Sequence, residues 1–143
     1  MRLVLLMMAL AAVVVAQSSL DFEFFKTRVQ PVFLAKREGH ARCYACHSIG
    51  TPYRLQRLSP GAATWNDEQS RKNFEATVNM INFRDVSASP LLIYALEEKA
   101  GGTHFHPGGK HWDSKKDAEW RILDEWAHGK KGSEPRPSGS GSR

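Results

Sequence analysis

The chain has little cysteine: Cys43 and Cys46 are the only two among its 143 residues. Two cysteines cannot form a disulfide network or a four-cysteine zinc site. The simplest interpretation of the pair is one disulfide, or two cysteines without a shared role. Apart from these cysteines, the chain contains no metal-binding motif. It also lacks the nucleophile elbow of serine hydrolases and a dinucleotide-binding loop, so the sequence gives no signal for hydrolytic or nicotinamide chemistry. No apolar run reaches the length of about 20 residues that a membrane-spanning helix needs.

The longest apolar run lies near the start of the chain, at residues 3–15, and contains no charge. It follows Arg2, and Val14, Val15 and Ala16 supply small residues at its end, a pattern typical of a secretory signal peptide. We therefore predict cleavage between Ala16 and Gln17, a periplasmic or secreted product, and a mature chain without a transmembrane span. An uncleaved anchor is the alternative interpretation.

Charge and composition limit the partners and the size of the folded unit. Without Arg2 the chain carries 19 Lys and Arg against 15 Asp and Glu. These charges form no stripe with interleaved aromatic residues, so we expect no nucleic-acid binding. Residues 132–143 are rich in Gly, Ser and Pro, and we predict a disordered tail there. The folded domain is expected to cover residues 20–131.

The two cysteines belong to the sequence Cys43-Tyr44-Ala45-Cys46-His47, a C-x-x-C-H motif. This is the spacing at which two thiols bond to the vinyl groups of one porphyrin and the following histidine binds the iron. The motif therefore predicts one haem c, attached through Cys43 and Cys46, with His47 as an axial ligand. Attachment of this kind follows export in bacteria, which agrees with the predicted signal peptide.

Apolar residues recur at helical spacing in four segments, and Gly- and Pro-rich loops separate them. Pro31 lies within the first segment, where the helix must kink or restart, and Gly39 is its expected end. Gly129 is the expected end of the last segment. We predict an all-α fold, a small cytochrome c-like domain wrapped around one covalently attached haem. The expected helices cover residues 21–38, 67–80, 91–98, and a stretch from 113 or 114 to 128.

Residues 22–47, F-E-F-F-K-T-R-V-Q-P-V-F-L-A-K-R-E-G-H-A-R-C-Y-A-C-H, resemble the start of a family of single-haem cytochrome c domains. These domains occur in Acidobacteria and are related to planctomycete-type cytochrome c domains. The segments at 89–92, 106–109 and 126–129 are similar as well, so that the resemblance covers residues 22–130. The middle departs from the pattern, because residues 84–86 replace a proline-glycine pair. The resemblance implies a fold and a bound haem, and it says less about the biochemical function.

The second axial ligand decides the chemistry of the iron, because a thioether raises its potential, a second imidazole lowers it, and an open position admits small molecules. His106 is the leading candidate, since it lies in a glycine-rich loop and the resemblance implies a histidine-x-Gly-Gly element there. Met80, the only methionine beyond the predicted signal peptide, is one alternative. His111 and His104, in the same loop as His106, are the others.

Further contacts to the haem can be predicted from residue type. Arginine pairs well with carboxylates such as haem propionates, which makes Arg54 and Arg71 candidates. Trp65 and Trp112 lie in predicted loops and are candidates for contacts with the porphyrin, whereas the tryptophans of the last helix are expected to belong to the core. Surface solvation is the plain interpretation of either arginine alone.

These features favour a non-enzymatic carrier of single electrons between redox partner proteins, a secreted or periplasmic monohaem cytochrome with two histidine ligands. A haem-dependent enzyme or a gas-binding sensor is the alternative, and it requires an open iron position. A haem relay within a larger redox assembly is a third interpretation.

Overall fold

The computed structural model describes residues 20–132. The predicted signal peptide and residues 133–143 of the predicted tail lie outside this part. In the described part the chain forms helices and loops with two isolated bridges and no strand, in agreement with an all-α fold. No described helix is long and apolar enough to cross a membrane.

The N-terminal helix is continuous but changes its winding twice. It consists of α2 (Phe22–Phe24), the π-helical turn η1 (Phe25–Val29) and α3 (Gln30–Leu34). The Asp21 carboxylate accepts a hydrogen bond from the Phe24 N–H and caps its start. Pro31 lies in the first turn of α3, directly after the π-helical turn, where its missing donor is tolerated without a break in the helix.

The predicted end of this helix at Gly39 is wrong, because α3 ends at Leu34 and Ala35 is already extended. The Arg37 side chain donates to the Val32 carbonyl, with 3.2 Å between Nη2 and the oxygen, and thus satisfies a carbonyl at the helix end. Gly39, with φ +73°, instead permits the turn that brings His40 back to Arg37.

The remaining helices lie close to the predicted segments but are shorter. The third predicted helix ends early because the Ala95 carbonyl accepts the N–H groups of His111 and Trp112 from a distant segment. The last helix begins at Ala118, later than predicted, where Asp117 caps it. The helices are α4 (Cys43–His47), α5 (Asp67–Val78), η2 (Val86–Ala88), α6 (Pro90–Ile93), η3 (Glu98–Ala100) and α7 (Ala118–Ala127).

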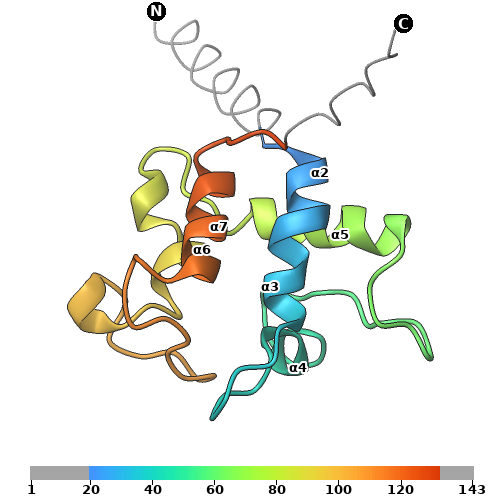
Figure 1. The fold of residues 1–143 in the computed structure, drawn as a ribbon, viewed down its shortest axis with the longest axis horizontal. Helices are drawn as coiled ribbons and strands as arrows, with labels where there is room; N and C mark the ends of the chain where they lie inside the picture. The colour runs from blue at the N-terminus through green and yellow to red at the C-terminus, as the bar shows by residue number, and fades with distance from the viewer. Residues whose placement is uncertain (1–19, 133–143) are drawn as a thin grey trace, which may run out of the picture.

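The core forms where α7 and α5 pack on the N-terminal helix (Figure 1). The rings of Phe25 and Phe74 lie 5.4 Å apart, and Trp126 contacts both. Trp126 is fully buried, and its Nε1–H donates to the Asp21 carbonyl at 2.9 Å. Trp120 is buried too and donates to the Leu92 carbonyl, which joins α7 to α6. The two tryptophans thus hold α7 in place.

Helix α5 buries polar residues as well as apolar ones. Ser70, Asn73 and Thr77 are fully buried on the side that faces the N-terminal helix and the loop after α4. Gln30 donates to Ser70, and Asn73 donates back to Gln30. This network fixes the loop after α4, which matters for the site.

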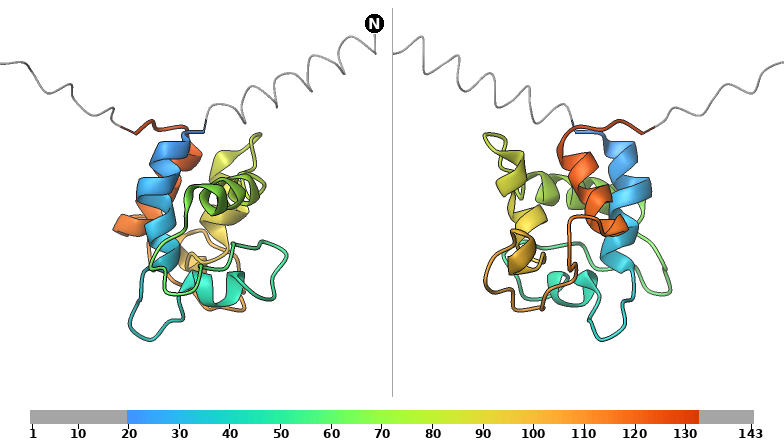
Figure 2. Two further views of the ribbon diagram at one scale, coloured as in Figure 1. Left: turned by 90° about the vertical axis from the view of Figure 1, so that its right-hand side faces the viewer. Right: turned by 60° about the vertical axis from the view of Figure 1, so that its left-hand side comes forward.

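The ends of the described chain lie together, with Gly132 beside Asp21. Helix α4 and the loop of residues 101–111 lie at the opposite end of the molecule (Figures 1 and 2). The C-x-x-C-H motif and the histidine-rich loop therefore meet in space, although about sixty residues separate them.

Candidate functional site

Helix α4 consists of the C-x-x-C-H motif itself. It starts after the extended residue Arg42, and because Cys43 and Cys46 are three positions apart, they lie on one face. Cys43 is half-buried and Cys46 is exposed, and both are free thiols. Burial raises the pKa of the Cys43 thiol, and the nearby Arg37 guanidinium opposes this shift. Both sulfur atoms are therefore available for thioether bonds.

His47, the last residue of α4, is held by the loop that follows. Its Nδ1 lies 2.8 Å from the Tyr53 carbonyl oxygen and 3.0 Å from the Thr51 hydroxyl oxygen. A carbonyl only accepts hydrogen bonds, so Nδ1 carries the proton and Nε2 keeps a free lone pair. Burial lowers the pKa of His47, which favours the neutral ring. This is the protonation state that binds a metal ion.

The Tyr53 carbonyl is itself held in position from several sides. Thr51 also donates its hydroxyl proton to this oxygen. The Tyr53 hydroxyl is hydrogen-bonded to Thr77 on α5 at 2.8 Å, and burial raises the pKa of this phenol. The acceptor for His47 thus belongs to the buried polar network of α5.

His106, in the loop of residues 101–111, has the same arrangement. Its Nδ1 donates to the Gly109 carbonyl at 2.7 Å, which again leaves Nε2 free. Gly109 has φ +80°, and a Cβ atom at Gly108 would come within 3.1 Å of the His106 ring. The two glycines therefore let the chain turn tightly around the imidazole.

The structure brings these two imidazoles together. The ring centroids of His47 and His106 lie 6.3 Å apart, and the ring planes differ by 17°. Each imidazole has its Nδ1 bonded to a backbone carbonyl and its Nε2 left as the free ligand atom, so the residues present fit an iron held by two histidine ligands.

The alternative ligands are placed differently. His111 lies 6.3 Å from His106 and 5.0 Å from His40 between ring centroids, and its buried Nδ1 has no hydrogen-bond partner in the described part. Burial lowers the pKa of His111 to about 4. His104 is exposed and pairs with Glu98. Met80 is half-buried and packs on the hydrophobic core.

The predicted contacts with the haem periphery are spread over the molecule. Arg54 is exposed beside α4, whereas Arg71 lies on α5 with its guanidinium 4.4 Å from the centre of the Phe22 ring. Trp65 is buried, contacts Tyr44 of α4 edge-on and donates to the Gln56 carbonyl. Trp112 is buried under Arg37 and contacts the His111 ring. Arg54 and the two tryptophans thus lie near the motif.

Several residues of this site carry no signal in the sequence. Thr51 and Tyr53 follow the motif at a distance that no pattern marks, and Arg37 precedes it within the predicted helix of residues 21–38. Arg37 forms an ion pair with Glu119 of α7, so it ties the turn before α4 to the C-terminal helix. Only the charge of Arg37 in a short loop could have indicated such a role.

Comparison of the chain with protein-family models, with curated proteins and with solved structures found no match. Among residues 20–132 no cluster of three or more His, Cys, Asp or Glu side chains is suited to a metal ion. The predicted site residues that the structure brings together are two cysteines and two histidines, a donor set that suits an iron already held in a porphyrin.

Proposed function

We propose that this protein is a secreted or periplasmic single-haem c-type cytochrome that carries one electron at a time. Cys43 and Cys46 would hold the haem through thioether bonds, and His47 and His106 would be the axial ligands. The observation that carries the proposal is the His47–His106 pair, whose centroids lie 6.3 Å apart with both Nδ1 atoms bonded to backbone carbonyls.

Haem iron supplies a one-electron redox couple when it is bound. The residues of the chain would keep electron transfer fast by holding the two imidazoles in one orientation when the iron changes its oxidation state. Tyr53 and Gly109 orient the two imidazoles through their carbonyls, and such hydrogen bonds also make a ligand more basic. With both imidazoles bound to the iron, no position would be left for a small molecule, which would favour electron transfer.

Thr51 and the network of α5 stiffen the side of His47, whereas His106 depends on a short glycine turn. A competing ligand would therefore displace His106 from the iron before it displaces His47. The predicted potential lies below that of a relative with histidine and methionine ligands, because a thioether raises the potential.

The proposal is tested by expression in a bacterium with a c-type maturation system. The double variant Cys43→Ala/Cys46→Ala should be exported but should lose haem staining on a denaturing gel, because these two thiols are the only ones in the chain. The matched control is Ser48→Ala, which removes a hydroxyl next to the motif and should keep the stain. Staining that persists in the double variant would overturn the proposal.

A further inference from the structure

Positive charge is concentrated at the end of the molecule that carries α4. Residues 36–57 contain five Lys and Arg but one acidic residue, Glu38. The rest of the described chain contains twelve Lys and Arg against thirteen Asp and Glu. The net positive charge of the described part thus comes from residues 36–57, and the rest of the described part is nearly neutral.

The cations at this end are mostly free. Arg37 pairs with Glu119, but Lys36, Arg42, Arg54 and Arg57 are exposed and form no ion pair within the described part. Charges without a nearby partner contribute most to the electric field outside the protein. An approaching molecule therefore meets a positive potential at the α4 end.

A hollow of about 420 Å³ lies on this end, beside α4. Arg54 and Arg57 line it together with the apolar side chain of Ile49, which is 59% exposed. Ile49 follows His47 by two residues, so the hollow lies next to the proposed iron ligand. The lining of the hollow is mainly polar, and the exposed Ile49 adds an apolar contact beside the two arginines, a mixture that is common at protein–protein contacts.

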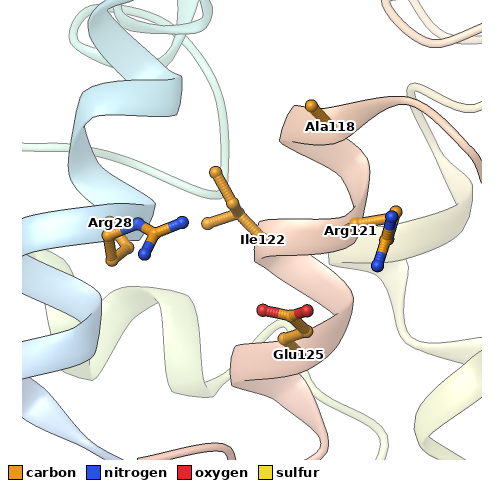
Figure 3. Close-up of a pocket in the computed structure, with 5 residues that line it drawn as sticks. All are labelled: Arg28, Ala118, Arg121, Ile122 and Glu125. Carbon is orange, nitrogen blue, oxygen red and sulfur yellow. The ribbon is translucent and has the colours of Figure 1, made fainter. Parts of the chain in front are cut away.

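A second hollow shows what this one lacks. It measures about 200 Å³ and lies between the N-terminal helix and α7, where Arg28 and the carboxylate of Glu125 point toward each other and Arg121 also lines the wall (Figure 3). Lys130, and then the two arginines, lower the pKa of Glu125, so the charges there compensate one another. No carboxylate lines the hollow beside α4, and its two arginines are left to bind an outside anion.

We infer that an acidic protein surface docks on the hollow formed by Ile49, Arg54 and Arg57, and that electrons leave or enter through this face. The partner presents carboxylate side chains to the arginines around an apolar contact with Ile49. The route of the electron rests on the proposed function, whereas the docking itself depends only on charge and shape.

The test measures adsorption of the haem-loaded protein on gold that carries a carboxylate-terminated monolayer, which stands in for an acidic protein surface. Bound mass is read with a quartz crystal microbalance, and electron transfer is read by voltammetry on the same surface. The variant Arg54→Glu/Arg57→Glu is compared with Arg84→Glu/Lys116→Glu, which has the same net charge but alters exposed cations outside residues 36–57.

We expect the first variant to lose about tenfold in affinity and the control to lose less than about twofold, and we expect added salt to remove the difference. Equal losses in both variants would overturn the inference, because net charge alone would then account for binding. Stronger binding to anionic lipid vesicles than to the monolayer would assign the face to a membrane. A wild-type dimer that the first variant abolishes would assign it to a second copy of the chain.

The two readouts separate the two proposals. Normal adsorption of a preparation whose visible spectrum shows no haem would contradict the proposed function and would leave docking to be judged by mass, whereas normal adsorption of haem-loaded protein without a voltammetric wave would contradict only the route. A wave whose rate is the same in the wild type and in adsorbed Arg54→Glu/Arg57→Glu would contradict the route through this face.

Discussion

Asn73 of α5 connects the core to the loop that holds His47, and its removal should be costly. Its side-chain oxygen accepts a hydrogen bond from the Gln56 N–H at 2.7 Å, and its amide donates to Gln30 at 3.3 Å. Asn73 is fully buried, so water cannot replace it. In Asn73→Ala the Gln56 N–H and the Gln30 side-chain oxygen would each lose this hydrogen-bond partner.

A buried group that loses its partner costs about 1–3 kcal/mol. Two such groups give about 2–6 kcal/mol, so we expect the free energy of unfolding of Asn73→Ala to fall by about 3 kcal/mol. This is a large part of the 5–15 kcal/mol that is usual for a domain. At about 4 °C per kcal/mol, the midpoint of thermal unfolding should fall by about 12 °C.

The measurement is thermal and urea-induced unfolding followed by far-UV circular dichroism at pH 7. The matched control is Glu75→Ala, an exposed position on the same helix, which should change stability by less than about 0.5 kcal/mol. Asn73→Asp keeps the acceptor for Gln56 but buries a charge, so it should be less destabilised at pH 4 than at pH 7 relative to the wild type. If Asn73→Ala costs no more than Glu75→Ala, the reasoning about this network is refuted.

Three further results are expected. The unfolded state binds a proton on His111 near pH 6.5 and the folded state only near pH 4, so stability should fall as the pH drops through this range and His111→Gln should flatten the curve. The loss should reach about 1–2 kcal/mol, since solvent screens a half-exposed ring, and an unchanged curve would contradict the assignment. Trp126→Phe removes the donor to the Asp21 carbonyl and part of a buried ring, so denaturant unfolding should show a loss of about 2–3 kcal/mol, and a loss below about 0.5 kcal/mol would be inconsistent with the packing. Intact-mass analysis of the exported protein should place its first residue at Gln17, and retention of residues 1–16 would indicate an anchor instead.

The sequence predicted the helical segments well because each has an apolar face with a recognisable start. The structure agrees with the expected start at Asp67 and with Gly129 after the end of α7. Helix ends were less predictable where groups outside the helix bond to the backbone near its end. The Arg37 side chain, five residues on, donates to the Val32 carbonyl, and the distant His111 backbone donates to the Ala95 carbonyl, and neither contact leaves a periodic pattern in the sequence.

For the site, the C-x-x-C-H spacing predicts Cys43, Cys46 and His47 as haem-binding residues because thioether chemistry dictates it. The structure places the His106 ring 6.3 Å from the His47 ring, in the glycine-rich loop where we predicted a second ligand. Thr51 and the Tyr53 carbonyl were not predictable as individual partners, because any backbone carbonyl could have accepted the hydrogen bond of His47.

The central claim is that His47 and His106 bind one haem iron. Two spectra test it most directly: that of the ferric protein, and that of the reduced protein before and after carbon monoxide is added. The account predicts low-spin iron without the long-wavelength band of an iron–methionine bond, and no prompt binding of carbon monoxide. His106→Ala should give high-spin iron that binds carbon monoxide, whereas Met80→Leu should change little. The opposite pattern, with Met80→Leu opening the iron and His106→Ala silent, would contradict the account and make Met80 the ligand.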